Sequence, residues 1–162
     1  MSSKAPAKYE DIIHTGAKAA AAVGVGGAIP GAGPAIDIAG MTTVWTTMIL
    51  AISERAGRPM TKDSATAFIR SFAKGAAAYI GGTIVFRQLL HLLPGIGTVS
   101  VMGINAAFNA TYTYKFGCAL VEYFEKPTFD EDDLYEFADD ILRAITPSVG
   151  DIVGTVRALS TW

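Results

Sequence analysis

Two polar residues, Asp37 and Asn105, stand early in helical stretches that otherwise carry no charge. A polar group in an apolar setting is costly unless it is paired, and ionisable residues between apolar helices often line the path of an ion or a substrate. One interpretation is therefore a pore or a binding groove between helices. The other, which we favour, is structural: Asp37 caps its helix, and Asn105 forms a hydrogen bond across a helix pair.

Two other stretches partly match known ligand-binding motifs, a dinucleotide-binding loop and a calcium loop, but each lacks required residues. Residues 24–27 read Gly-Val-Gly-Gly, yet Ile29 stands where a dinucleotide-binding loop has its third glycine, and no Gly-Lys-Ser/Thr follows. The run DEDD at 130–133 lacks the glycine and the later ligands of a calcium loop. We interpret the glycines as helix-packing residues and the acids as the first turn of a helix.

The chain has two histidines, His14 and His91, and one cysteine, Cys118. The histidines lie far apart in the sequence and show no metal-ligand spacing. No Ser-His-Asp or Cys-His pattern supports a nucleophile. The sequence therefore predicts no catalytic residue, no metal site and no cofactor, and the single cysteine excludes an internal disulfide.

The composition favours a membrane or a large buried surface. Of 162 residues, 51% are apolar and 17% are charged, whereas about a quarter of the residues are charged in typical soluble domains. Basic residues are scattered singly through the first half of the chain, which argues against a nucleic-acid-binding surface. The start MSSKAPAKYED has no apolar segment of the kind found in secretory signals.

Small and apolar residues divide residues 9–127 into two predicted helical hairpins. The first has helices over about 9–28 and 35–56, and the second has helices over about 66–92 and 99–125. Each pair is joined by a glycine–proline turn that is apolar, so we expect both turns to lie in an apolar environment. The turn residues are Pro30, Gly31, Gly33 and Pro34 in the first hairpin and Pro94, Gly95 and Gly97 in the second.

The two hairpins resemble each other in sequence. AKAAAAVGVGG at 17–27 parallels AKGAAAYIGG at 73–82, and IPGAG at 29–33 parallels LPGIG at 93–97. An internal repeat is the simplest interpretation, with the third helix about two turns longer than the first.

The two ends of the chain differ from the hairpins. Residues 1–8 are expected to form a disordered lead-in. Residues 128–162 predict two shorter amphipathic helices separated by Pro147, and the acids at 130–133 suit the first turn after Thr128. We expect this tail to pack on the bundle or on a partner. The predicted fold is therefore all-α, with four long helices in two related hairpins and two shorter C-terminal helices.

The uncharged parts of the helices are short for a membrane span. Residues 38–53 and 99–114 carry no charge, but a full span needs about 20 apolar residues. If the hairpins insert, the Lys- and Arg-bearing connector at 55–74 places the charged loops and both termini on the cytoplasmic side. The alternative is a soluble bundle with the second and fourth helices in its core.

Residues 93–141, which hold the turn and the last helix of the second hairpin and the start of the tail, resemble the YcjF-like domain of unknown function. The shared features are Pro94-x-x-Gly97, Asn105-Ala106-Ala107, Thr111, Thr113, Gly117, Tyr123-Phe124 and the acidic stretch after Pro127. IPGAGPAIDIAG at 29–40 is similar to the first turn of that family, and the NAAF region is faintly similar to the EcsC family. The YcjF-like domain often accompanies Era-like GTPase domains. The resemblance therefore implies a helical, membrane-associated domain linked to GTPases, and it implies no catalytic residue.

We therefore predict a non-enzymatic, membrane-associated helical-hairpin protein that acts as an anchor or an oligomeric scaffold for a GTPase acting in trans. Its expected partners are membrane lipid and further copies of itself, and not nucleic acid. The alternative is a soluble, cytoplasmic module that self-assembles and buries the same helices between subunits. A weaker alternative is a small pore or transporter that uses Asp37 and Asn105.

Overall fold

A computed structural model describes residues 5–26, 33–72, 98–128, 130 and 138, and for residues 26, 33–38, 98–102 and 104 it describes the backbone alone. Within these ranges every regular element is a helix and no strand occurs. The all-α prediction is confirmed for this part of the chain. The arrangement as two related hairpins stays a prediction, and the C-terminal helices lie almost entirely outside the described residues.

The chain enters the bundle through a short 3-10 helix, η1 (Ala7–Tyr9), which continues into α1 (Glu10–Gly26). Glu10 and Asp11 occupy the first turn of α1, where the helix dipole favours negative charge. The expected disordered lead-in differs from the structure over residues 5–8, because Ala5 is buried and its N–H donates a hydrogen bond to the Tyr114 hydroxyl at 2.9 Å. Residues 1–4 lie outside the described residues.

The second long helix, α2, spans Gly33–Arg55. It begins two residues earlier than expected and includes Pro34, which the first turn of a helix tolerates because the N–H groups there have no intrahelical partner. Gly57 ends it with a φ of 75°. The N–H of Gly57 donates to the Glu54 carbonyl and that of Arg58 donates to the Ser53 carbonyl, which is the glycine-terminated helix end expected from the sequence.

A further helical stretch covers residues 62–72. The predicted start at residue 66 was wrong by one turn. Thr61 supplies the reason, because its Oγ1 accepts a hydrogen bond from the Ser64 N–H at 3.1 Å and so caps the first turn. The rest of the predicted third helix, residues 73–92, lies outside the described residues.

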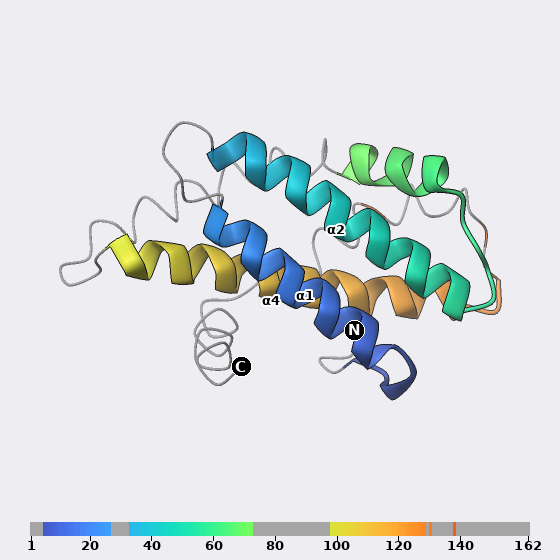
Figure 1. Cartoon of the computed structure of the whole chain (residues 1–162). Helices are drawn as coiled ribbons and strands as arrows, with labels where there is room; N and C mark the ends of the chain where they lie inside the picture. Colours follow the sequence, from blue (N-terminus) through green and yellow to red (C-terminus); the bar gives the residue numbers. More distant parts are fainter. Residues whose placement is uncertain (1–4, 27–32, 73–97, 129, 131–137, 139–162) are drawn as a thin grey trace.

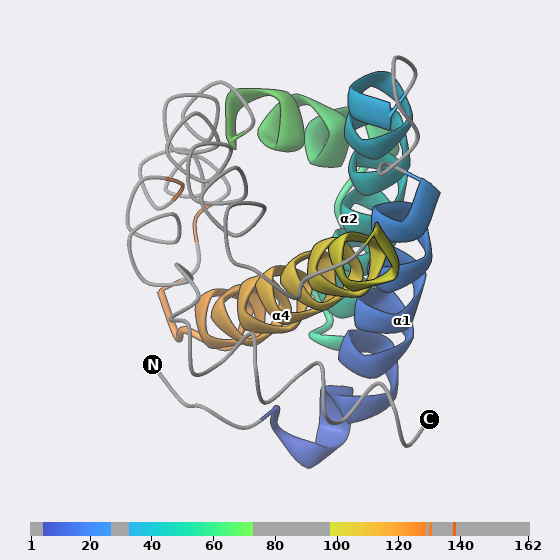
Figure 2. The same ribbon diagram turned by 90° about the vertical axis from the view of Figure 1, so that its left-hand side faces the viewer.

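The fourth helix, α4, spans Thr98–Phe124, within one residue of its predicted limits. Figures 1 and 2 show α1 lying against both α2 and α4 and running antiparallel to each, while the 62–72 helix lies over α2. The contact of α1 with α4 is more extensive than its contact with α2. The C-terminal end of α1 and the N-terminal ends of α2 and α4 therefore meet at one end of the bundle.

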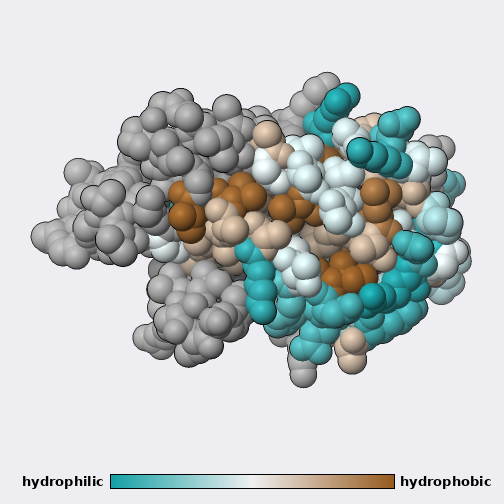
Figure 3. All heavy atoms as spheres, in the orientation of Figure 1, coloured by the Kyte–Doolittle hydropathy of each residue, from teal (hydrophilic) through white to brown (hydrophobic). Residues whose placement is uncertain are grey.

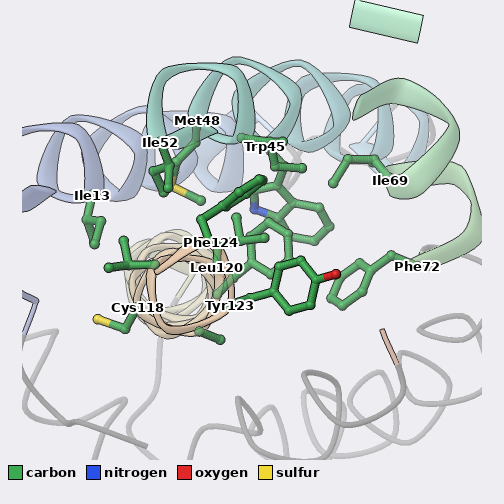
Figure 4. Packing of buried hydrophobic residues seen from close by; sticks show 14 of the residues in the cluster. Ile13, Trp45, Met48, Ile52, Ile69, Phe72, Cys118, Leu120, Tyr123 and Phe124 are labelled. Carbon is green, nitrogen blue, oxygen red and sulfur yellow. The ribbon is translucent and has the colours of Figure 1, made fainter. Parts of the chain in front are cut away.

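The hydrophobic core surrounds the C-terminal half of α4. Figure 4 shows α4 end-on, with side chains from α1, α2 and the 62–72 helix directed toward it. The largest fully buried side chains are Tyr9, Ile13, Ile49, Ile52, Phe68, Ile69, Phe72, Phe116, Leu120, Tyr123 and Phe124. Their burial fixes α4 as the central helix of the described part.

Candidate functional site: a charge-poor end of the helix bundle

The residues expected to act at the turns are only partly described. Gly33 and Pro34 form the first two positions of α2, and Asp37 follows within the same helix. For these three residues the structure gives the backbone position and not the side chain. The other predicted turn residues, Pro30, Gly31, Pro94, Gly95 and Gly97, lie outside the described residues.

Asn105 lies buried between α4 and the end of α1, with 5% of its surface exposed. Its Nδ2 donates a hydrogen bond to the Gly24 carbonyl at 2.6 Å. Among the described residues its Oδ1 has no hydrogen-bond partner. Asn105 thus makes the interhelical bond of the structural interpretation, and its acceptor is a carbonyl in the last described turn of α1.

Gly24 allows this bond because the two backbones touch. A Cβ placed on Gly24 would lie 2.8 Å from the Asn105 carbonyl oxygen and 2.9 Å from Ala106 N. The surrounding contact consists of small side chains from α1 and α4: Ala17, Ala21, Ala106 and Ala110. Small residues let helix backbones approach closely, as they also do between helices in membranes.

The helices carry almost no charge at the end of the bundle where Asn105 meets Gly24. Residues 19–26 of α1, 38–53 of α2 and 98–114 of α4 carry no charge. The antiparallel packing directs these segments toward the end where α1 finishes and α2 and α4 begin, which we call the charge-poor end. Figure 3 shows most of the hydrophilic atoms on the opposite half of the described surface. Asp37 is the one charged residue on the described backbone at the charge-poor end.

The opposite end is closed by polar contacts around residues 5–11, which we call the N-terminal strap. The Glu125 carboxylate accepts hydrogen bonds from the Tyr9 hydroxyl and from Lys8 Nζ. Arg55 donates to the Lys8 carbonyl at 2.9 Å and pairs with Asp11. The Tyr9 and Lys8 donors lower the pKa of Glu125, and Arg55 lowers the pKa of Asp11.

Catalytic chemistry finds little support in the described residues. His14 lies 3.9 Å from the Glu10 carboxylate and edge-on to the Tyr114 ring, and His91 is outside the described residues. Burial raises the pKa of Cys118 to about 11, so its thiol stays protonated at neutral pH and is a poor nucleophile. Within the described ranges no group of His, Cys, Asp and Glu has the geometry to hold a metal ion.

Sequence reasoning missed the contacts that join the helices. Trp45 Nε1 donates to Thr113 Oγ1 at 2.9 Å in the core, and Tyr9 reaches Glu125 across the chain. Tyr9 could be noted as an aromatic residue just before a helix, and Trp45 as the one large polar-tipped aromatic of α2. Neither signal names a partner, because both partners lie more than 60 residues away in the sequence.

None of the described helices combines the length and the apolar composition that crossing a membrane would require. A model of the family described as "Domain of unknown function (DUF697)" matches residues 8–147. "Magnetosome membrane protein 22" of Magnetospirillum gryphiswaldense is 29% identical over 111 residues, which cover 68% of this chain and 55% of that protein. The chain thus spans about half the length of this relative. No solved structure matches.

Proposed function

The chain belongs to the DUF697 family, the YcjF-like domain of unknown function, and from that premise we propose that it is a non-enzymatic protein that embeds its charge-poor end in a membrane. In this position it serves as an anchor or as an oligomeric scaffold, to which a GTPase acting in trans can be recruited. Support from a relative comes from the name of the magnetosome membrane protein, which describes that protein as a membrane protein.

The observation that carries the proposal is the separation of charge along the bundle. Three uncharged helical segments point to one end, where Asp37 is the one charged residue on the described backbone, and the ion pairs of Lys8, Arg55 and Glu125 lie at the other. Burying an unpaired charge in hydrocarbon is unfavourable. A bundle that enters a membrane at one end needs this separation, and a bundle surrounded by water does not.

Exposed threonines of α2 are compatible with lipid contact. Thr43 Oγ1 donates to the Ala39 carbonyl at 3.0 Å, and Thr47 Oγ1 donates to the Thr43 carbonyl at 2.9 Å. Both hydroxyl protons are therefore satisfied within the helix, so the face they share requires no water. Val25 adds a large apolar side chain that is 44% exposed on α1. The proposal needs embedding and not a full span, which agrees with the shortness of the uncharged segments 38–53 and 98–114.

Cell fractionation with and without detergent tests the proposal. We expect the protein in the membrane fraction, with detergent required to release it as a monodisperse particle. Recovery as a monodisperse monomer without detergent would overturn membrane embedding. Recovery without detergent at several times the mass of the monomer would instead support the soluble, self-assembling module.

The scaffold role requires self-association that persists after release from lipid. Chemical crosslinking in membranes, followed by sizing in detergent, should give discrete oligomers. A strictly monomeric particle under both conditions would contradict the scaffold role and would still be consistent with the anchor role.

A further inference from the structure

Positively charged residues border the uncharged parts of several helices. Counting from the charge-poor end, the first charged residue is Lys18 on α1 and Lys115 on α4. On the 62–72 helix the charged residue nearest its described end is Arg70. The α2 helix contributes no charge between residues 38 and 53, and Asp37 lies beyond this level. On α1 and α4 the charged part thus begins with a lysine, and Arg70 is the last charged residue of the described 62–72 helix, with Lys74 following it in the sequence.

Contacts in the core show which residues of α1, α2 and α4 lie at the same height along the bundle axis. A Cβ on Gly16 would lie 2.9 Å from Met48 Sδ and 3.6 Å from Thr113 Cγ2, and a Cβ on Gly117 would lie 3.2 Å from the same sulfur. Gly16, Met48, Thr113 and Gly117 therefore lie within about one helical turn of one another along the bundle. Lys115 lies between two of these residues.

Lys18 follows Gly16 by two residues, which is about 3 Å along the helix axis. Phe72 ties the 62–72 helix to the same level, because its ring centroid lies 4.9 Å from that of Phe116 and 5.6 Å from that of Trp45. Arg70 precedes Phe72 by two residues. The three cations therefore lie within about one helical turn of one cross-section.

These cations come from three different helices of the bundle. Lys18 and Arg70 are exposed and Lys115 is half-buried. In Figure 2 the three helices are seen separately, with the 62–72 helix above α4 and α1 at the right. We call Lys18, Arg70 and Lys115 the cationic collar.

We propose that the cationic collar binds the phosphates of anionic phospholipid headgroups and sets the depth to which the charge-poor end enters the membrane. This inference rests on the proposed function and names its lipid class. The uncharged stretch of α4 beyond the collar, residues 98–114, has a length of about 25 Å at 1.5 Å per residue. That length stays within a hydrocarbon core of about 30 Å. Long Lys and Arg side chains keep their charge in the headgroup layer while their stems contact apolar groups.

Vesicle flotation tests the lipid class. The purified protein is mixed with vesicles of phosphatidylcholine, with or without phosphatidylglycerol, and binding is compared with that of K18Q/R70Q/K115Q. Each basic residue near an anionic surface strengthens binding about 5-fold, so the triple variant should lose roughly 100-fold in affinity for the anionic vesicles. Its affinity for the zwitterionic vesicles should be unchanged.

The matched control is R58Q/K62Q/K126Q, which removes the same charge from the end that holds the N-terminal strap. These residues lie farther from the membrane than the screening length of about 8 Å at physiological salt, so the loss should stay below about 5-fold. An equal loss in both triple variants, or none in the collar variant, would overturn the collar. Absence of wild-type binding to either vesicle would overturn the proposed function itself.

A depth measurement separates the collar from general attraction. Thr15 and Ala22 are both exposed on α1 and stand on opposite sides of Lys18 along the helix. An environment-sensitive thiol dye is attached to T15C or to A22C, each in a chain that also carries Cys118→Ser. With anionic vesicles the dye at position 22 should shift to the blue and the dye at position 15 should not. Equal shifts at both positions, or none at either, would overturn the proposed depth.

Discussion

The two sides of α4 are built in opposite ways. Toward α1 the contact is made of alanine and glycine, and the backbones touch at Gly24 and Ala106. Toward α2 and the 62–72 helix it is made of rings, with Trp45, Phe72 and Phe116 in mutual contact. A close backbone contact has no room for an added atom, whereas an aromatic cluster depends on filled volume. The same helix should therefore respond to enlargement on one side and to truncation on the other.

Truncating the aromatic side should have the largest effect. Phe116 is fully buried against Trp45, Phe68 and Phe72. Phe116→Ala should lower the free energy of unfolding by about 3–5 kcal/mol because it leaves a cavity in a packed core. Denaturant unfolding followed by circular dichroism measures this loss. Phe116→Leu is the control and should lose less than half as much; equal losses would show that filled volume does not hold this side together.

Enlarging a residue on the small-residue side of α4 should have the second-largest effect on the free energy of unfolding. The Cβ of Gly24→Val would meet the backbone of Asn105 and Ala106, and backbone atoms cannot move aside as a side chain end does. We expect a loss of about 1–3 kcal/mol in unfolding free energy. Gly103 on α4 has no atom of the described residues within 4 Å of the corresponding position, so Gly103→Ala should be neutral or stabilise by up to about 1 kcal/mol. A harmless Gly24→Val would refute the close contact.

The hydrogen bond within the aromatic side can be isolated by a double-mutant cycle. Trp45→Phe leaves Thr113 Oγ1 buried without the donor that reaches it at 2.9 Å. A loss of about 1–2 kcal/mol is expected. Adding Thr113→Val should recover part of that loss, since replacing both partners by apolar groups removes the unpaired oxygen. Strictly additive single and double variants would mean that the bond contributes nothing.

Acid should affect the N-terminal strap and spare both sides of α4. Glu125 and Asp11 have lowered pKa values, so their contribution is present above the ordinary values of 4.5 and 3.8 and is lost as pH falls through the folded-state values. Because these groups are exposed, the effect should be the smallest of the four. Unfolding free energy measured from pH 6 to about pH 3 should decline less steeply in Glu125→Gln; an unchanged slope would exclude this carboxylate as a cause.

Local patterns in the sequence were sufficient to predict α1, α2 and α4. Apolar runs and the helix breaker Gly57 placed α1, α2 and α4 within about two residues of their observed limits, although Pro34 lies inside α2 and not before it. The start of the 62–72 helix was misplaced because the capping bond of Thr61 to Ser64 has a weaker signature than a run of apolar residues. The buried polar candidate Asn105 was identified from its position, but its acceptor on Gly24, 81 residues away, was not.

The sequence by itself determined that the described part is helical and that charge is absent from long parts of three helices, because both properties depend on residues close together in the chain. Only the tertiary structure decided that α1 packs most closely on α4, that the uncharged segments point to one end and that Lys18, Arg70 and Lys115 share a level. Those outcomes depend on which surfaces fit together, as Gly24 fits against Ala106. Shape complementarity between distant segments leaves no periodic trace in the sequence.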